Sequence, residues 1–201
     1  MKEVFAFFIL AAAVGAQANL LTNGDFELGN TGFSSDYVHS PLDYTPEGIY
    51  AVDTNPNNHH SLWLSYGDHT SGAGKMLIIN GRTSIGTSPW YQTVSLVGGT
   101  SYSFSAWVRS PYSPESLQLG LNGSVLSGST VSVSTTAWSQ WTYTIVAPST
   151  GSHVIQLLPP STASAGNDYT VDDISLRVVP EPASIASLAA GVALLALRRK
   201  K

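Results

Sequence analysis

The chain contains no cysteine among its 201 residues. Zinc–thiolate sites, iron–sulfur clusters, thiol catalysis and disulfide bonds all require that residue, so each is excluded. A domain of about 160 residues buries enough apolar surface to fold without such cross-links. The lack of cysteine is therefore compatible with an exported protein.

Positive charge is scarce between residues 19 and 178. Eleven acidic residues stand against four bases, which gives this part of the chain a formal balance of −7. Nucleic-acid binding needs a cationic surface that neutralises phosphates, so the composition argues against nucleic acid as a partner. The surplus of carboxylates offers oxygen ligands to a hard cation such as calcium.

Familiar catalytic motifs are also missing. The chain has no G-x-S-x-G, no H-E-x-x-H and no phosphate-binding glycine loop. Glycoside hydrolysis needs two carboxylates across a cleft, and no signature marks such a pair here. The adjacent His59 and His60 occur in a polar stretch, NPNNHHS, which favours a solvated loop over a metal site. We therefore expect no catalytic residues.

Long apolar runs occur only at the two ends of the chain. Residues 1–18 combine Lys2, an apolar run and a small-x-small triplet ending at Ala18. This layout is typical of a secretory signal peptide with a signal helix, cleaved after Ala18. An uncleaved anchor or a buried helix is the alternative, although the run is shorter than the ~20 residues that span a bilayer.

Residues 179–201 form a second terminal segment with three parts. Pro180, Glu181 and Pro182 precede the apolar run 183–197, and Arg198, Arg199, Lys200 and Lys201 follow it. As a helix the run extends ~22 Å, so it crosses the ~30 Å hydrocarbon layer only with help from its flanks. The basic end is expected to stay on the cytoplasmic side of the membrane. Pro180 and Pro182 are expected to keep residues 179–182 extended just before the apolar run. A plain C-terminal anchor or an amphipathic helix is the alternative.

This three-part order resembles the PEP-CTERM sorting signal of Gram-negative bacteria. The resemblance implies that Pro180, Glu181 and Pro182 are recognised by an exosortase, a membrane transpeptidase-like enzyme. It also implies that the basic residues 198–201 stop transfer of the chain across the inner membrane. The short C-terminal transmembrane helix would then lie in that membrane only transiently. The protein would then be exported through the inner membrane to the cell surface or the extracellular matrix.

The sequence of residues 19–178 predicts an all-β domain. Short alternating runs bounded by Gly, Pro and Asn dominate, and no long segment has a helical apolar period. Residues 101–109 alternate most clearly, with Tyr102, Phe104, Ala106 and Val108 on one face. Residues 37–61 lack periodicity and are expected to form long surface loops. The other expected strands are 76–79, 90–96, 117–121, 124–133, 141–146, 153–158 and 169–178, which favours an antiparallel sandwich or barrel.

Three segments resemble carbohydrate-binding modules with a galactose-binding-like jelly roll. They are 19–27 (NLLTNGDFE), 88–110 (SPWYQTVSLVGGTSYSFSAWVRS) and 169–176 (YTVDDISL), in the order found in such modules. The resemblance implies one domain over residues 19–178, built from two packed antiparallel sheets. It also implies a structural calcium ion and a sugar site on a sheet face or at loop tips.

The implied calcium ion ties the first strand to the last. Carried over to this chain, its carboxylates are Glu27 and Asp172, with Asp173 as the alternative to Asp172. A backbone carbonyl near Gly24 or Lys75 supplies a further ligand. Calcium takes 6–8 oxygen ligands, so such a set suits it. The alternative is that Glu27 caps a turn and the two aspartates are solvated.

Sugar recognition needs a flat aromatic surface flanked by hydrogen-bonding groups. Trp107 is the first candidate, because the alternation places it opposite the apolar face, beside Arg109. Trp63 and Tyr66 are candidates for the rim of the same site. The alternative is burial, since tryptophan is highly buried on average. For Trp90, Trp138 and Trp141 we expect packing in the core or at a sheet edge.

Together these features predict an exported, non-catalytic protein that binds polysaccharide or matrix glycan. A structural or adhesive matrix protein without its own sugar site is the main alternative, and a secreted hydrolase is a weaker one. Exposed, clustered aromatic side chains would favour glycan binding, whereas fully buried tryptophans would favour the matrix protein.

Overall fold

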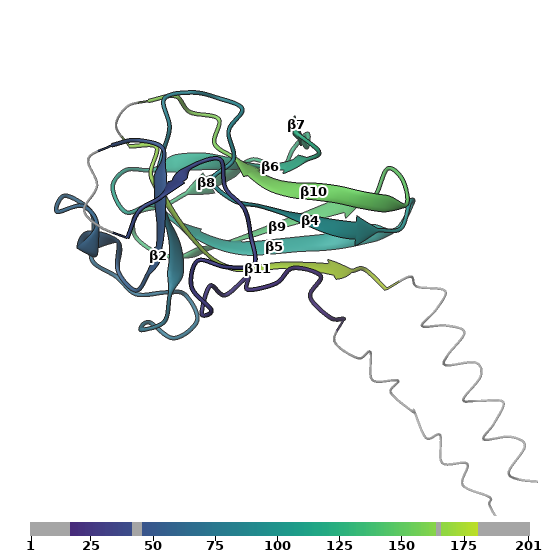
Figure 1. The fold of residues 1–201 in the computed structure, drawn as a ribbon, viewed down its shortest axis with the longest axis horizontal. Helices are drawn as coiled ribbons and strands as arrows, with labels where there is room; N and C mark the ends of the chain where they lie inside the picture. Colours follow the sequence, from purple (N-terminus) through teal and green to yellow (C-terminus); the bar gives the residue numbers. More distant parts are fainter. Residues whose placement is uncertain (1–16, 42–45, 164–165, 181–201) are drawn as a thin grey trace, which may run out of the picture.

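Two β-sheets pack face to face in the computed structural model, which describes residues 17–41, 46–163 and 166–180 (Figure 1). One sheet has six strands in the order β1-β2-β3-β11-β5-β9. The other has five, with β4-β10-β6-β7 in order and β8 paired to β6. The expected all-β sandwich of jelly-roll type is confirmed. The expected signal helix and C-terminal transmembrane helix lie outside the described residues.

All pairings in the two sheets are antiparallel except that of β1 with β2. Among the described residues, no helix has the length and apolar character that crossing a bilayer requires. The strands are β1 (Val38–His39), β2 (Ile49–Asp53), β3 (Met76–Asn80), β4 (Tyr91–Leu96), β5 (Ser101–Arg109), β6 (Glu115–Leu121), β7 (Ser124–Val125), β8 (Val131–Val133), β9 (Ser139–Val146), β10 (Gly151–Leu158) and β11 (Tyr169–Val178).

The main core lies between the two sheets. Strand β5 shows the alternation expected from its sequence, because Tyr102, Phe104, Ala106 and Val108 are all at most 2% exposed. The neighbouring side chains of β5 point to the outer face of the six-stranded sheet, since successive residues of a strand alternate. Trp90 and Trp141 are buried in the same core, as expected.

The first segment of the domain runs alongside the last strand. Asn19 Oδ1 accepts the backbone N–H of Leu176 at 2.8 Å, and the Leu20 N–H donates to the Leu176 carbonyl at the same distance. Strand β11 has a bulge between Asp172 and Ser175, next to the Gly24 carbonyl, which accepts the Ile174 N–H at 2.8 Å. A Cβ on Gly24 would lie 2.0 Å from the Ile174 carbonyl oxygen, so this close approach requires glycine.

Two expectations about local structure are wrong. Residues 37–61 are not only loops, since they contain β1 and β2. The expected strand 124–133 divides into β7 and β8, because the chain turns between them at Gly128, which has φ 77°. Strand β2 has only five residues, too few to show a clear period in the sequence.

A second, smaller core covers the outer face of β2 and β3. Trp63, which follows β2 in a long connection, packs there in a cluster of buried apolar residues. The same connection buries His59, which is 3% exposed and bonds to Asp53 Oδ2 at 2.9 Å. The expectation of a solvated His59 is therefore wrong, because this connection folds back onto the sheet. The other members of the cluster are Ile49, Ala51, Met76 and Ile78, with Tyr66 and Trp138 packed against it.

Asp168 lies at the edge of this smaller core and is 6% exposed. Its pKa is raised to about 6, mainly by burial and in smaller part by the negative charge of Glu47. The Gly81 N–H, the Trp63 side chain and the charge of His60 oppose that rise. The Gly81 nitrogen is 3.4 Å from Asp168 Oδ1, which is long for a hydrogen bond. The ionised carboxylate is therefore poorly compensated.

We predict that Gly24→Ala destabilises the domain strongly, because the new methyl group collides with backbone of a central strand. The expected loss in the free energy of unfolding is about 3 kcal/mol or more. Gly29→Ala is the control, since that glycine has φ 77° and open space around it and should lose about 1 kcal/mol. Equal losses in urea denaturation for the two variants would contradict the packing described for Gly24.

We predict that Asp168→Asn removes a pH-dependent loss of stability. An acid whose folded pKa exceeds its unfolded pKa favours the folded state most when protonated, so its contribution falls as pH rises from about 4 to about 6. The wild type should lose about 2–3 kcal/mol over this range relative to the variant. Asp25→Asn, at an exposed acid, is the control. Parallel stability–pH curves for wild type and Asp168→Asn would refute the prediction.

Candidate functional site

Trp107 is the centre of the candidate site on the outer face of the six-stranded sheet. It lies on β5, with Asp172 of β11 on one side and Gln140 of β9 on the other. It is half-buried, because the imidazole of His69 stacks on its indole with ring centroids 3.7 Å apart and an interplanar angle of 13°. One face of Trp107 is therefore already covered by the protein.

The loop that carries His69 is fastened to the bulge of β11. His69 Nδ1 and Asp173 Oδ2 are 2.7 Å apart, and the Thr70 hydroxyl donates to both oxygens of the same carboxylate at 2.8 Å. The His69 backbone N–H donates to Asp172 Oδ2 at 2.9 Å. These contacts fix the position of the imidazole over Trp107.

The other predicted sugar-contacting residues belong to a packed layer beside Trp107. The Arg109 guanidinium lies over the Tyr66 ring at 3.8 Å, and its Nε donates to the Thr135 carbonyl. The Tyr66 hydroxyl lies 3.0 Å from that of Thr170, and burial raises the pKa of Tyr66. Trp63 is 4% exposed in the smaller core. The structure thus brings Trp107, Arg109 and Tyr66 to one region, and Trp107 also lines an open cleft.

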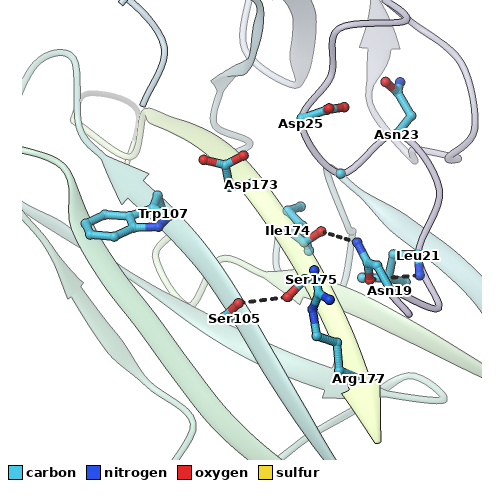
Figure 2. A pocket seen from close by; sticks show the side chains of 11 residues that line it. Asn19, Leu21, Asn23, Asp25, Ser105, Trp107, Asp173, Ile174, Ser175 and Arg177 are labelled. Atoms are coloured by element: carbon cyan, nitrogen blue, oxygen red, sulfur yellow. Dashed lines mark hydrogen bonds between the residues drawn. The ribbon is translucent and has the colours of Figure 1, made fainter. Parts of the chain in front are cut away.

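That cleft has a volume of about 450 Å³ and lies between the first segment of the domain and strands β5 and β11 (Figure 2). In Figure 2, Trp107 and Asp173 lie on one side, and Asn23 and Asp25 lie on the other. Its polar lining consists mainly of the side chains of Asn19, Asn23, Asp25, Ser105, Asp173, Ser175 and Arg177.

Of these lining residues, Trp107 was expected from the sequence as a sugar contact, and Asp173 was named only as an alternative calcium ligand. The position of Ser105, two residues before Trp107 in an alternating strand, was a usable signal, because the two side chains must share a face. No local signal marks Asn23 or Asp25, since they reach the cleft only through the pairing of the first segment with the bulge of β11.

Asp172, which precedes the cleft residue Asp173 in β11, is completely buried. Its pKa is raised to about 7, mainly by burial and also by the nearby charges of Asp173 and Asp68. Backbone N–H groups of Asp173 and His69 donate to its two oxygens and oppose the rise. The protein thus concentrates negative charge at this end of β11, which a cation would stabilise.

The predicted metal ligands fall into two neighbouring groups. Glu27 Oε1 accepts the backbone N–H of Lys75 at 2.8 Å, so these two predicted residues are in contact. A Cβ on Gly74 would approach both Glu27 and Asp68, which places these two carboxylates close together. Among the described residues, the potential ligand atoms within 4.8 Å of one another belong to a different set, His69, Asp172 and Asp173.

The predicted sorting motif begins directly after the sheet. The Val179 N–H donates to the Ser101 carbonyl at 2.9 Å, so the ladder between β11 and β5 continues to the residue before Pro180. Glu181, Pro182 and the basic residues 198–201 lie outside the described residues.

Comparison with protein families identifies residues 178–200 as a PEP-CTERM protein-sorting motif. The chain therefore carries this motif, as the order of Pro-Glu-Pro, apolar run and basic end predicts. The motif indicates export and exosortase-dependent sorting. A comparison with curated proteins finds no match.

Solved structures with the same fold include carbohydrate-binding modules. The CBM22-2 xylan-binding domain of Paenibacillus barcinonensis Xyn10C is 15% identical with a TM-score of 0.50, and the match covers 78% of this chain and 98% of that one. The Stig cyclase Fisc of Fischerella sp. TAU is 13% identical with a TM-score of 0.53, covering 81% and 97%. An arabinose-bound α-L-arabinofuranosidase, MgGH51, is 18% identical with a TM-score of 0.56, covering 89% and 30%.

At these low sequence identities, the structural similarity establishes the fold of this chain and not its function. The chain spans 66% or less of several solved chains that it matches. The matches include a cyclase as well as binding modules, and one fold can carry unrelated functions. The chain is therefore a jelly-roll sandwich of the kind found in carbohydrate-binding modules, joined directly to a PEP-CTERM sorting motif.

Proposed function

We propose that this exported protein binds polysaccharide without catalysis, in the cleft beside Trp107. The observation that carries the proposal is the combination of an indole with a ring of polar side chains around one open cleft. Sugar sites use this combination, because the C–H faces of a pyranose pack on an aromatic ring while its hydroxyl groups need hydrogen-bonding partners. Ser105 and Asp25 supply such groups here, whereas the Asn23 amide already bonds to the backbone of its own loop.

The outer face of the sheet continues from the cleft as a polar surface. Ser103, Thr142 and Thr144 are exposed on it, next to Ser105 in the strand registers. Their hydroxyl groups can donate and accept hydrogen bonds, as sugar hydroxyls do. A glycan longer than the cleft would therefore meet hydrogen-bonding groups beyond it.

The acids of the cleft support binding rather than hydrolysis. Asp172, whose raised pKa would suit a general acid, is completely buried and has no access to a substrate. Asp173 already accepts hydrogen bonds from the Thr70 hydroxyl and contacts the imidazole of His69. Glycoside hydrolysis needs two carboxylates that both reach the scissile bond. Asp25 does face Asp173 across the cleft, but the contacts of Asp173 with Thr70 and His69 compete with such a role, so we favour binding.

One observation favours the alternative of a matrix protein without a sugar site. His69 covers a face of Trp107, and the predicted partners Trp63 and Tyr66 are packed against protein. The aromatic surface left for a sugar is thus small. The two functions differ in a single measurable property, which is the affinity of the domain for glycans.

We predict that Trp107→Ala weakens binding of residues 19–178 to the polysaccharide identified on a glycan array at least tenfold. The loss corresponds to about 1.4 kcal/mol of stacking that the methyl group cannot replace. Tyr112→Ala, at an exposed aromatic side chain that does not line the cleft, should bind as wild type does. Failure of the wild-type domain to bind any polysaccharide would favour the matrix protein.

We also propose that a structural calcium ion binds among the acids around residues 68–75. Glu27 and Asp172 are the carboxylate ligands, and the Lys75 carbonyl is a further one. The fit is supported by the incompletely compensated charge of Asp172 and by the contact between Glu27 and Lys75. Calcium would supply positive charge to this end of β11 and join it to the first segment.

We predict that calcium at about 100 times its Kd raises the melting temperature of residues 19–178 by about 5–10 °C, and that a chelator reverses the gain. Asp172→Asn should lose this gain, because the amide carries no charge for the ion. Glu115→Gln, at an acid of β6 outside the proposed ligand set, should keep it. An identical melting temperature with calcium and with chelator would remove the ion from the proposal.

A further inference from the structure

Strand β9 is an open edge of the six-stranded sheet. Its eight residues pair with β5 on one side, over the register from Ser101–Val146 to Val108–Ser139. Within residues 17–41, 46–163 and 166–180, no other backbone or side-chain group hydrogen-bonds to the main chain of Ser139–Val146. Half of its N–H and C=O groups therefore point to the outside of the sheet without a partner from the described chain.

The other sheet edges are shorter. Strand β4 has six residues and is covered at its first, Tyr91, which exchanges two backbone hydrogen bonds of 2.9 Å with Ser34. At the remaining edges, β1 and β7 have two residues each and β8 has three. Natural sandwiches usually shorten or cover their edges, and among the described strands the eight-residue β9 is the longest edge.

The sequence of β9 lacks every common device that prevents pairing with another chain. Its residues, SQWTYTIV, include no charged residue, no proline and no glycine. Aromatic and β-branched residues favour extended pairing. Although residues 19–178 carry a net charge of −7, none of that charge lies on β9. Two copies of this strand can therefore meet without opposing like charges.

We propose that β9 pairs antiparallel with β9 of a second copy of this chain about a twofold axis. With Thr142 on the axis, Thr142 opposes its own copy, Gln140 opposes Thr144, and Trp141 opposes Tyr143. This register keeps the core-facing residues of both copies on one face of the joined sheet and the hydroxyl-bearing residues on the other. A twofold contact of this kind is closed, so it gives a dimer and not a filament.

The dimer would place both Trp107 clefts on the same face of one continuous sheet. Trp107 lies on β5, the strand next to β9, so each cleft would be near the joined edge. A polymer that contacts both clefts would bind more tightly than one that contacts a single cleft. The dimer itself rests on the edge of β9 and does not depend on glycan binding.

The experiment uses the cysteine-free background of the full chain, purified in a mild detergent. Thr142→Cys should give a covalent dimer under oxidation, because the two cysteines would be directly opposed across the axis, within reach of a disulfide. Ser103→Cys is the matched control. It replaces an exposed hydroxyl on the same face, one strand further in, and should stay monomeric on non-reducing gels.

The noncovalent dimer is tested by light scattering, which gives the mass of the protein after the mass of the bound detergent is subtracted. The wild type and Ser103→Lys should have the mass of two copies, whereas Thr142→Lys should have the mass of one, because two lysines would oppose each other on the axis. A wild-type monomer, or a Thr142→Lys dimer, would overturn the proposal. The second outcome would assign the association to another part of the chain.

Discussion

The close contact between the Gly24 backbone and the bulge of β11 determines the architecture of the candidate site. Strand β11 lies in the middle of the six-stranded sheet, between β3 and β5, so its position is fixed by two ladders. The bulge gives Asp173 a φ of 51° and turns its side chain toward the cleft. The first segment reaches the bulge only because Gly24 has no side chain. One glycine thus allows the two walls of the cleft to meet.

The same contact also bears on the negative charge of Asp172, beside the bulge of β11. Asp172 is fixed in a buried position, and its carboxylate depends on two backbone N–H groups for stabilisation. Hydrogen bonds of this kind offset part of the cost of burying an ionised group, and the raised pKa shows that the offset is incomplete. A bound cation would complete it. The proposed calcium ion would therefore stabilise the cleft by offsetting the cost of the buried Asp172 carboxylate.

The parts of the fold that the sequence predicts are those with local causes. The alternation of β5 predicts its buried and exposed faces, because each residue's direction follows from its neighbours in the strand. The smaller core could not be predicted in this way. Trp63 and Tyr66 come from an aperiodic connection, and only the tertiary fold brings them onto β2 and β3. Likewise Asp25 and Asp173 are far apart in sequence, so their meeting in one cleft depends on strand pairing and not on spacing.

The two ends of the described domain emerge together, which relates the cleft to the sorting motif (Figure 1). Arg177 donates to the Gln17 carbonyl, and it also lines the cleft. Pro180 follows Arg177 by three residues, a distance of about 10 Å in an extended chain. The ladder continues to Val179, so no flexible spacer separates the sheet from the motif. The Arg177 end of the cleft therefore lies close to the start of the motif, whereas Trp107, opposite Asp172, lies further along the sheet.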